Sequence, residues 1–228
     1  MPPATPGSTD TPDTPEAAAK ARFWDKIARK YAAGPVEDPA GYERTLARTR
    51  ELLSPTQRVL EVGCGTGTTA LHLAPSTGHM LATDVSPEMI AIAREKLAAS
   101  PRPNLEFAVA DADAPGFGQA TYDVVLAFNL LHLVADLDAA LSSLVAALEP
   151  GGVLVSKTAC MGDMNPLITR LVIPVMRLFG KAPPVLCFDA AQLRAALTRH
   201  GLEVVALEYH GSKGKDARPF IIAKKIAT

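Results

Sequence analysis

Short apolar runs alternate with amphipathic stretches over most of the chain. Seven runs are expected as β-strands: Arg58–Val62, Met80–Thr83, Leu105–Ala110, Asp123–Phe128, Val153–Thr158, Glu203–Tyr209 and Phe220–Lys224. Helices are expected between them at Thr68–Ala74, Pro87–Ala98, Leu137–Leu148 and Ala190–His200. Strands that alternate with helices indicate a parallel sheet covered on both faces. The last two strands are joined only by residues 211–219, so they are expected to pair antiparallel.

Two helices are expected ahead of the first strand. Ala17–Ala33 places Phe23, Ile27 and Tyr31 on one face, and a second helix covers about Pro39–Leu53. Residues 1–20 contain five prolines among small polar residues and are expected to be a disordered tail. The remainder, 21–228, is expected to be one domain, with a helical cap at 21–55.

Residues 159–189 interrupt the alternation of strands and helices. They are mostly apolar, but too short and too often broken by arginine and proline to span a bilayer. Two interpretations stay open, an extra core helix or a helical lid over an apolar acceptor pocket. The position favours a lid, because ligands of open α/β sheets bind at the carboxyl ends of strands.

Composition and charge exclude several functional classes. A formal net charge of −1 gives no general attraction to nucleic acid or to anionic membranes. The three cysteines have no zinc-ligand or disulfide-framework spacing, and no metal site is expected. Without an apolar signal-type segment at its start, the chain is expected to be cytoplasmic. The sequence does not indicate an oligomeric state.

The stretch E-V-G-C-G-T-G follows the first expected strand and precedes a helix. Three alternating glycines, at 63, 65 and 67, let a ligand approach the backbone and the helix N-terminus closely. Asp84 follows seventeen residues after Gly67, at the end of the second strand, where a carboxylate can accept from the two hydroxyls of a ribose. The glycine motif alone would be weak evidence, and Asp84 strengthens it.

Two further segments end at the same edge of the sheet. Asp111 and Ala112 follow the third strand, where a carboxylate can accept from an exocyclic amine and a backbone N–H can donate to a ring nitrogen. The sequence F-N-L-L-H, from Phe128 to His132, follows the fourth strand. All four segments should therefore converge on one site.

In order and as a set, these motifs resemble those of class I S-adenosylmethionine-dependent methyltransferases. The resemblance covers roughly residues 23–225, and the opening F-W-D-K-I-A-R-K-Y resembles small-molecule enzymes of the ubiquinone/menaquinone C-methyltransferase type. It implies a Rossmann-like seven-stranded sheet of order 3-2-1-4-5-7-6, with strand seven antiparallel. The implied S-adenosylmethionine site comprises Tyr31, Glu61, Gly63, Cys64, Gly65, Gly67, Asp84, Val85, Asp111, Ala112 and Asn129.

The resemblance also implies a role for each group of residues. Glu61 and the glycines would shape the pocket for the methionine part, Asp84 would bind the ribose, and Asp111 with Ala112 the adenine. Asn129 would lie beside the sulfonium, and Tyr31 would close over the methionine end.

Several residues keep an alternative interpretation. Tyr31 and His132 are the candidate catalytic residues, yet His132 could merely begin a helix and Tyr31 could be a core residue. Trp24 is equally a core residue or a pocket wall. Asp84 and Asp111 could be capping residues, Asp113 is expected to be a loop acid, and Cys64 a small residue rather than a nucleophile.

The expected function is methyl transfer by in-line displacement to a small, largely apolar molecule, such as a phenol, thiol, amine or quinone. One alternative is a non-catalytic protein that binds S-adenosylmethionine for regulation. Another is a nicotinamide-dependent oxidoreductase, although the glycine spacing does not match G-x-G-x-x-G. A macromolecule-directed methyltransferase is disfavoured by the charge and by the absence of an Asn/Asp-Pro-Pro-aromatic motif.

Overall fold

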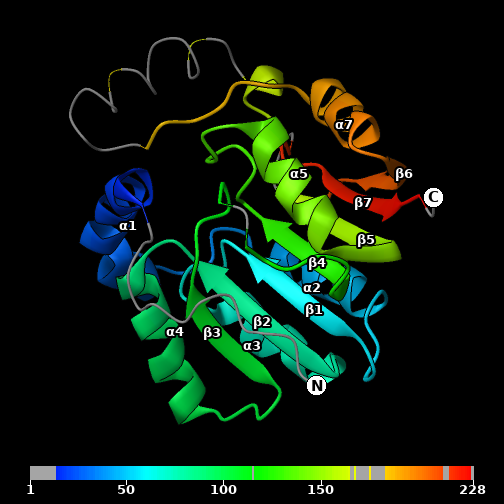
Figure 1. Cartoon of the computed structure of the whole chain (residues 1–228). Helices are drawn as coiled ribbons and strands as arrows, with labels where there is room; N and C mark the ends of the chain where they lie inside the picture. The colour runs from blue at the N-terminus through cyan, green and yellow to red at the C-terminus, as the bar shows by residue number, and fades with distance from the viewer. Residues whose placement is uncertain are drawn as a thin grey trace.

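The computed structural model describes residues 14–114, 116–164, 167, 175, 183–212 and 216–226. Its centre is a seven-stranded sheet of order β3-β2-β1-β4-β5-β7-β6 (Figure 1). The strands are β1 (Arg58–Val62), β2 (His79–Asp84), β3 (Leu105–Val109), β4 (Tyr122–Phe128), β5 (Leu148–Lys157), β6 (Leu202–Glu208) and β7 (Phe220–Lys225). β7 runs antiparallel to both β5 and β6, and the other neighbouring pairs are parallel. The expected strand order and orientation are confirmed.

The sheet is buried on both faces because its central strands are apolar at successive positions. In β4, Val125 and Ala127 pack into one core cluster, and Val124 and Leu126 into the other. Successive side chains of a strand point to opposite faces, so an unbroken apolar run suits a strand that is covered on both sides.

Two sets of helices provide that cover. Helices α5 (Leu137–Ala147) and α7 (Ala190–Arg199) pack on one face, and α2 (Pro39–Arg50), α3 (Thr68–Leu73) and α4 (Pro87–Ala99) contribute to the core on the other (Figure 1). The predicted start of α4 is confirmed, since Ser86 caps it by accepting from the Met89 N–H, with a proline in first position. In the described part of the chain, no helix combines the length and the apolar character needed to cross a membrane.

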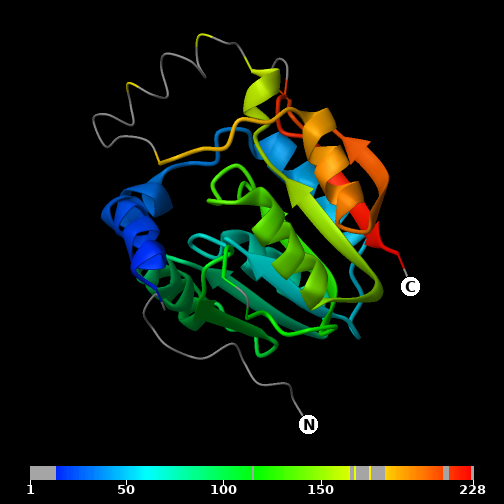
Figure 2. The ribbon, with the colours of Figure 1, turned by 45° about the horizontal axis from the view of Figure 1, so that its top comes forward.

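Helix α1 (Pro15–Ala33) begins earlier than expected, inside the segment assigned to the tail. Thr14 caps it by accepting from the Ala17 N–H at 3.1 Å, and Pro15 occupies the first turn, so residues 15–20 belong to the helix. Residues 1–13 lie outside the described part. Of the predicted cap at 21–55, α1 lies beside α4 (Figures 1 and 2), whereas α2 packs on the sheet.

Strand β5 also begins earlier than expected, at Leu148 rather than Val153. Leu148 pairs with Tyr122 of β4, and the register then shifts before Val124 pairs with Val153. The turn residues at 149–152 are therefore part of an irregular strand. Most of the predicted lid at 159–189 lies outside the described residues, which include 159–164 and 183–189 of it.

Candidate functional site

A cavity of about 380 Å³ lies where β1, β2, β3 and β4 end. It lies within the range typical of small-ligand sites. Ten of the eleven residues predicted for the cofactor line it: Tyr31, Glu61, Gly63, Cys64, Gly65, Asp84, Val85, Asp111, Ala112 and Asn129. The exception is Gly67. The sheet and helix α1 therefore bring together residues up to about a hundred positions apart in the sequence.

The three glycines of the turn meet three different surroundings, although all have left-handed φ values of 54° to 73°. A Cβ on Gly63 would lie 2.7 Å from Leu130 Cδ1, and one on Gly67 would lie 2.6 Å from the Phe107 ring and 2.7 Å from Ala93. A Cβ on Gly65 would meet nothing within 4 Å. Gly67 is thus required by packing, and the space left open for a ligand is at Gly65.

Asp84 is fixed directly beside that open space. Its Oδ2 accepts from the Gly65 N–H at 2.9 Å and its Oδ1 from the Ser86 N–H at 3.0 Å. Burial raises the pKa of Asp84 to about 6, against the opposing effect of these two bonds. A carboxylate oxygen has two lone pairs, so each Asp84 oxygen keeps one position for a further donor such as a ribose hydroxyl.

Glu61 forms the floor of the cavity and is only 2% exposed. Burial, together with the charge of Asp84, raises the pKa of Glu61 to about 8. Its Oε2 has no hydrogen-bond partner among the described residues. A buried carboxyl without a partner is costly, and a cationic group of a ligand in the cavity would offset that cost.

Cys64 lines the cavity between Gly63 and Gly65. Burial raises the pKa of its thiol well above the usual value, and the nearby carboxylates add to the effect. The thiolate is the nucleophilic form of cysteine, so a thiol held protonated is a poor nucleophile. This matches its interpretation as a small residue of the turn.

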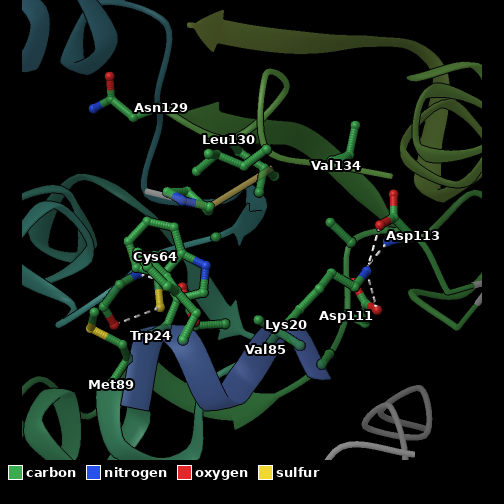
Figure 3. A pocket seen from close by; sticks show the side chains of 18 of the residues that line it. Lys20, Trp24, Cys64, Val85, Met89, Asp111, Asp113, Asn129, Leu130 and Val134 are labelled. Atoms are coloured by element: carbon green, nitrogen blue, oxygen red, sulfur yellow. Dashed lines mark hydrogen bonds and ion pairs between the residues drawn. The ribbon is translucent and has the colours of Figure 1, made fainter. Parts of the chain in front are cut away.

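Lys20, which the sequence did not indicate as a site residue, reaches from α1 to the two acids that follow β3 (Figure 3). Its Nζ lies 2.7 Å from Asp111 Oδ1 and 2.5 Å from Asp113 Oδ2. All three residues line the cavity, so Asp113 is more than a loop acid. About ninety residues separate Lys20 from these acids, and the sequence placed it in the expected tail. No pattern in the sequence near Lys20 therefore pointed to this contact.

The end of β4 forms another part of the wall. Asn129 has a φ of 52°, a left-handed conformation that asparagine adopts more readily than most residues, and its N–H donates to Lys157 O at 2.6 Å. Asn129 and Asp111 lie at opposite sides of the close-up (Figure 3). Leu130 contributes an apolar surface between them.

His132 is placed differently from the other predicted residues, because it is not among those that line the cavity. Its Nδ1 lies 2.8 Å from Thr158 Oγ1, and its carbonyl accepts from the Leu186 N–H at 2.8 Å. Burial lowers the pKa of His132 to about 4, so the ring is neutral at pH 7.

Helix α1 supplies three aromatic residues of the wall, Phe23, Trp24 and Tyr31. Tyr31 is 58% exposed, which indicates a position at the rim rather than in the core. Pro183 and Pro184, at the end of the predicted lid segment, also line the cavity. These apolar groups face a floor that carries Glu61 and Asp84.

The donor set fits S-adenosylmethionine better than a dinucleotide. Two acids flank the glycine turn, where the Asp84 carboxylate would repel a pyrophosphate. Both acids would favour an ammonium or a sulfonium, Glu61 by releasing its proton. The open space at Gly65 admits a ligand to the backbone, and Asp84 and Asp111 offer acceptors for hydroxyl and amine donors.

Comparisons with known proteins agree with this assignment. Residues 60–154 match a family model described as "Methyltransferase domain". The chain is 36% identical over 107 residues to a reducing polyketide synthase, Preu2, from Preussia isomera, a match that covers 44% of this chain and 5% of that protein. It is 34% identical over 87 residues to the magnesium-protoporphyrin O-methyltransferase of Rhodobacter capsulatus, covering 38% of this chain and 39% of that one. The chain thus spans well under half the length of these relatives.

Among solved structures, the geranyl diphosphate C-methyltransferase of Streptomyces coelicolor A3(2) has the same fold. The TM-score is 0.70 at 15% identity, and the match covers 95% of this chain and 100% of that one. That structure was solved in complex with S-adenosyl-L-homocysteine. The motifs, the strand order and the family model matched over residues 60–154 thus agree on a methyltransferase domain with the class I fold.

Proposed function

We propose that this protein transfers the methyl group of S-adenosylmethionine to a small, largely apolar acceptor. One observation carries the proposal: a single cavity joins the acidic floor and open glycine turn to a wall of aromatic and aliphatic side chains. The acidic floor and the glycine turn suit the cationic cofactor, and the aromatic and aliphatic wall suits an apolar acceptor.

Each end of the cofactor has a matching group in the cavity. Glu61 and the backbone at Gly65 would hold the amino-acid end, Asp84 the ribose, and Asp111 with Ala112 the adenine. Asn129 would then lie beside the sulfonium. When bound, the cofactor would supply an activated methyl group, with the acceptor providing the electron pair of the new bond and the pair of the broken C–S bond staying on sulfur.

The protein's own contribution is mainly alignment in a site that excludes water. Holding donor and acceptor in line can supply about 7–11 kcal/mol of the barrier. A positive charge is lost in the displacement, so an apolar wall from Trp24 and Leu130 suits the reacting end better than another carboxylate would. Pro183 and Pro184 would close this end, in line with a lid role for residues 159–189.

His132 and Tyr31 remain the candidate catalytic residues of this proposal. His132 is neutral at pH 7 and can accept a proton, but it is not among the described residues that line the cavity. Tyr31 already lines the cavity and can position an acceptor through its hydroxyl.

The cofactor assignment is tested by calorimetric titration of S-adenosylmethionine into the wild type and into Asp84→Asn. Loss of the charged acceptor should weaken binding about 10- to 100-fold, since hydrogen bonds to charged groups are worth about 1.5–3 kcal/mol. Asp138→Asn, an exposed acid at the start of α5, is the matched control and should bind as the wild type does. Equal affinity of all three proteins would refute the role of Asp84.

The acceptor is tested by a screen of apolar phenols, thiols, amines and quinones with methyl-labelled cofactor. Transfer to an apolar member, with none to a nucleic acid or a protein, supports the proposal. Cofactor binding without transfer to any acceptor would instead favour a regulatory S-adenosylmethionine-binding protein.

A further inference from the structure

Lys20 is the one cation that the described residues place in the wall of the cavity. It projects from α1 onto the segment after β3, and its Nζ is shared by Asp111 and Asp113 (Figure 3). Burial acts against the charge of Lys20, but the hydrogen bonds to the two acids prevail and raise its pKa. The ammonium and both carboxylates are partly shielded from water, with side-chain exposures of 26%, 12% and 15%.

The hydrogen bonds around Asp111 leave few ways for its carboxylate to turn. Oδ1 accepts from Lys20 at 2.7 Å and from the Asp113 N–H at 3.2 Å, and Oδ2 lies 2.5 Å from the same Nζ. An ionised carboxylate offers about four lone-pair positions. Three are used by described residues, and the remaining one is on Oδ2.

Asp113 holds the other side of the lysine in place. Its Oδ2 accepts from Lys20 and also from the Ala135 N–H at 2.9 Å. Asp113 is thus held by the backbone at Ala135, and it in turn holds the Lys20 ammonium in place. Asp111 is therefore oriented by a cation whose own position is fixed.

We infer that Lys20 is a positioning residue that sets the base specificity of the cofactor site, by holding the Asp111 carboxylate so that it presents one acceptor to the 6-amino group of adenine. The inference rests on the proposed function, since it concerns how that same site recognises its cofactor. A 6-amino purine donates a hydrogen bond to this acceptor. A 6-oxo purine presents an oxygen to a carboxylate, and the two repel each other.

Without Lys20, the two neighbouring carboxylates repel each other and Asp111 can turn away from the base. Loss of the cation also makes the cavity more negative, which changes its affinity for every charged ligand. Absolute affinity therefore mixes two effects. The ratio of affinities for two ligands that differ only in the base isolates the positioning effect.

The experiment titrates two thioethers by calorimetry, S-adenosyl-L-homocysteine and the same molecule with hypoxanthine in place of adenine. The proteins are the wild type, Lys20→Met, Lys20→Gln and Lys20→Arg. Arg29→Met is the matched control, because Arg29 is also on α1 and also pairs with an acid, Glu95 at 2.7 Å, but it does not line the cavity. Circular dichroism and thermal melting establish that each variant is folded.

The wild type should prefer the adenine thioether, and Lys20→Met and Lys20→Gln should each reduce that preference about tenfold, which corresponds to about 1.4 kcal/mol. Lys20→Arg should keep most of it, and Arg29→Met all of it. An unchanged ratio in both uncharged variants, including one in which both affinities fall equally, would overturn the inference. Absence of binding of either thioether to the wild type would instead refute the proposed function.

Discussion

Gly65 and Gly67 share a left-handed backbone but differ in what a side chain would meet. Gly65→Ala costs only about 1–2 kcal/mol for the backbone, whereas Gly67→Ala adds the contact with Phe107 and Ala93, about 1–3 kcal/mol more. We expect Gly67→Ala to lower the free energy of unfolding by more than Gly65→Ala does. Gly65→Ala should instead weaken cofactor binding at least tenfold, because its methyl group occupies the open space.

Urea unfolding and calorimetry on the two variants check this prediction. The assignment of the two roles would be wrong if Gly65→Ala bound the cofactor as tightly as the wild type. It would equally be wrong if Gly67→Ala were as stable as Gly65→Ala. Each variant serves as the control for the other, since the substitution and the backbone conformation are the same.

Motif spacing and the family resemblance together predicted most of the residues that line the cavity, but not what each one contacts there. Glycines 63, 65 and 67 were equivalent by spacing, and the close approach of Ala93 and Phe107, both distant in sequence, distinguishes the last of them. Lys20 was missed for the same reason, since its partners follow β3. Asp84 was predictable because the end of a strand fixes the place of the next side chain.

At the level of elements, α1 is held to α4 as well as to the site. Asp25 accepts from Ser86 Oγ at 2.6 Å and from the Glu88 N–H at 3.2 Å, so it joins α1 to the first turn of α4. Asp25→Ala should raise the exchange rate of α1 amides about fivefold, for a loss of about 1 kcal/mol, and leave β1 and β4 unchanged. Hydrogen exchange followed by mass spectrometry measures this.

Arg29→Ala is the control for that experiment. Arg29 and Glu95 are both more than half exposed, and such pairs contribute little. If Arg29→Ala loosened α1 as much as Asp25→Ala, the contact at Ser86 would not be what holds the helix.

The sequence predicted helix α1 but not its buried side. Aromatic spacing suggested a face of Phe23, Ile27 and Tyr31, whereas the buried positions are Ala17, Ala21 and Ala28. Small residues let two helices approach closely but give a weak hydrophobic pattern, and the aromatic residues are used for the cavity. The early start of β5 was missed because Leu148 continues the helical pattern and pairs with Tyr122 only in the folded sheet.

For the whole molecule, Glu61 links protonation to stability and, under the proposed function, to cofactor binding as well. Its pKa is about 8 in the folded protein and about 4.3 in an unfolded chain. The folded state holds this proton more tightly than the unfolded chain does. The stabilisation from protonated Glu61 is therefore fully present below about pH 4 and is lost as the pH rises to about 8. Glu61→Gln should therefore become more stable relative to the wild type as the pH increases from 6.5 to 8.

Urea unfolding of the free protein at pH 5, 6.5 and 8 measures this difference. Glu203→Gln, an exposed acid of β6, should show no such trend. In the wild type, calorimetry at pH 7 in buffers of different ionisation enthalpy should detect a proton released on cofactor binding, and Glu61→Gln should not release it. Parallel stability curves for wild type and Glu61→Gln would contradict the role given to this carboxyl.

Periodicity predicted the strands, the helices and the antiparallel pairing of β6 with β7, which are joined by a short connection. The full strand order was implied by the resemblance to class I methyltransferases, and the structure has that order. The lid at 159–189 remains a prediction, because its apolar run is interrupted by Arg170, Pro174 and Arg177 and most of it lies outside the described residues.

The acidic floor of the cavity also bears on product inhibition. Under the proposed function, the spent thioether carries one positive charge fewer than the methyl donor, while Glu61 and Asp84 stay in place. Their attraction thus favours fresh donor over spent product and helps turnover to continue as product accumulates. That preference should narrow as ionic strength rises, since salt screens the charges of a partly open site.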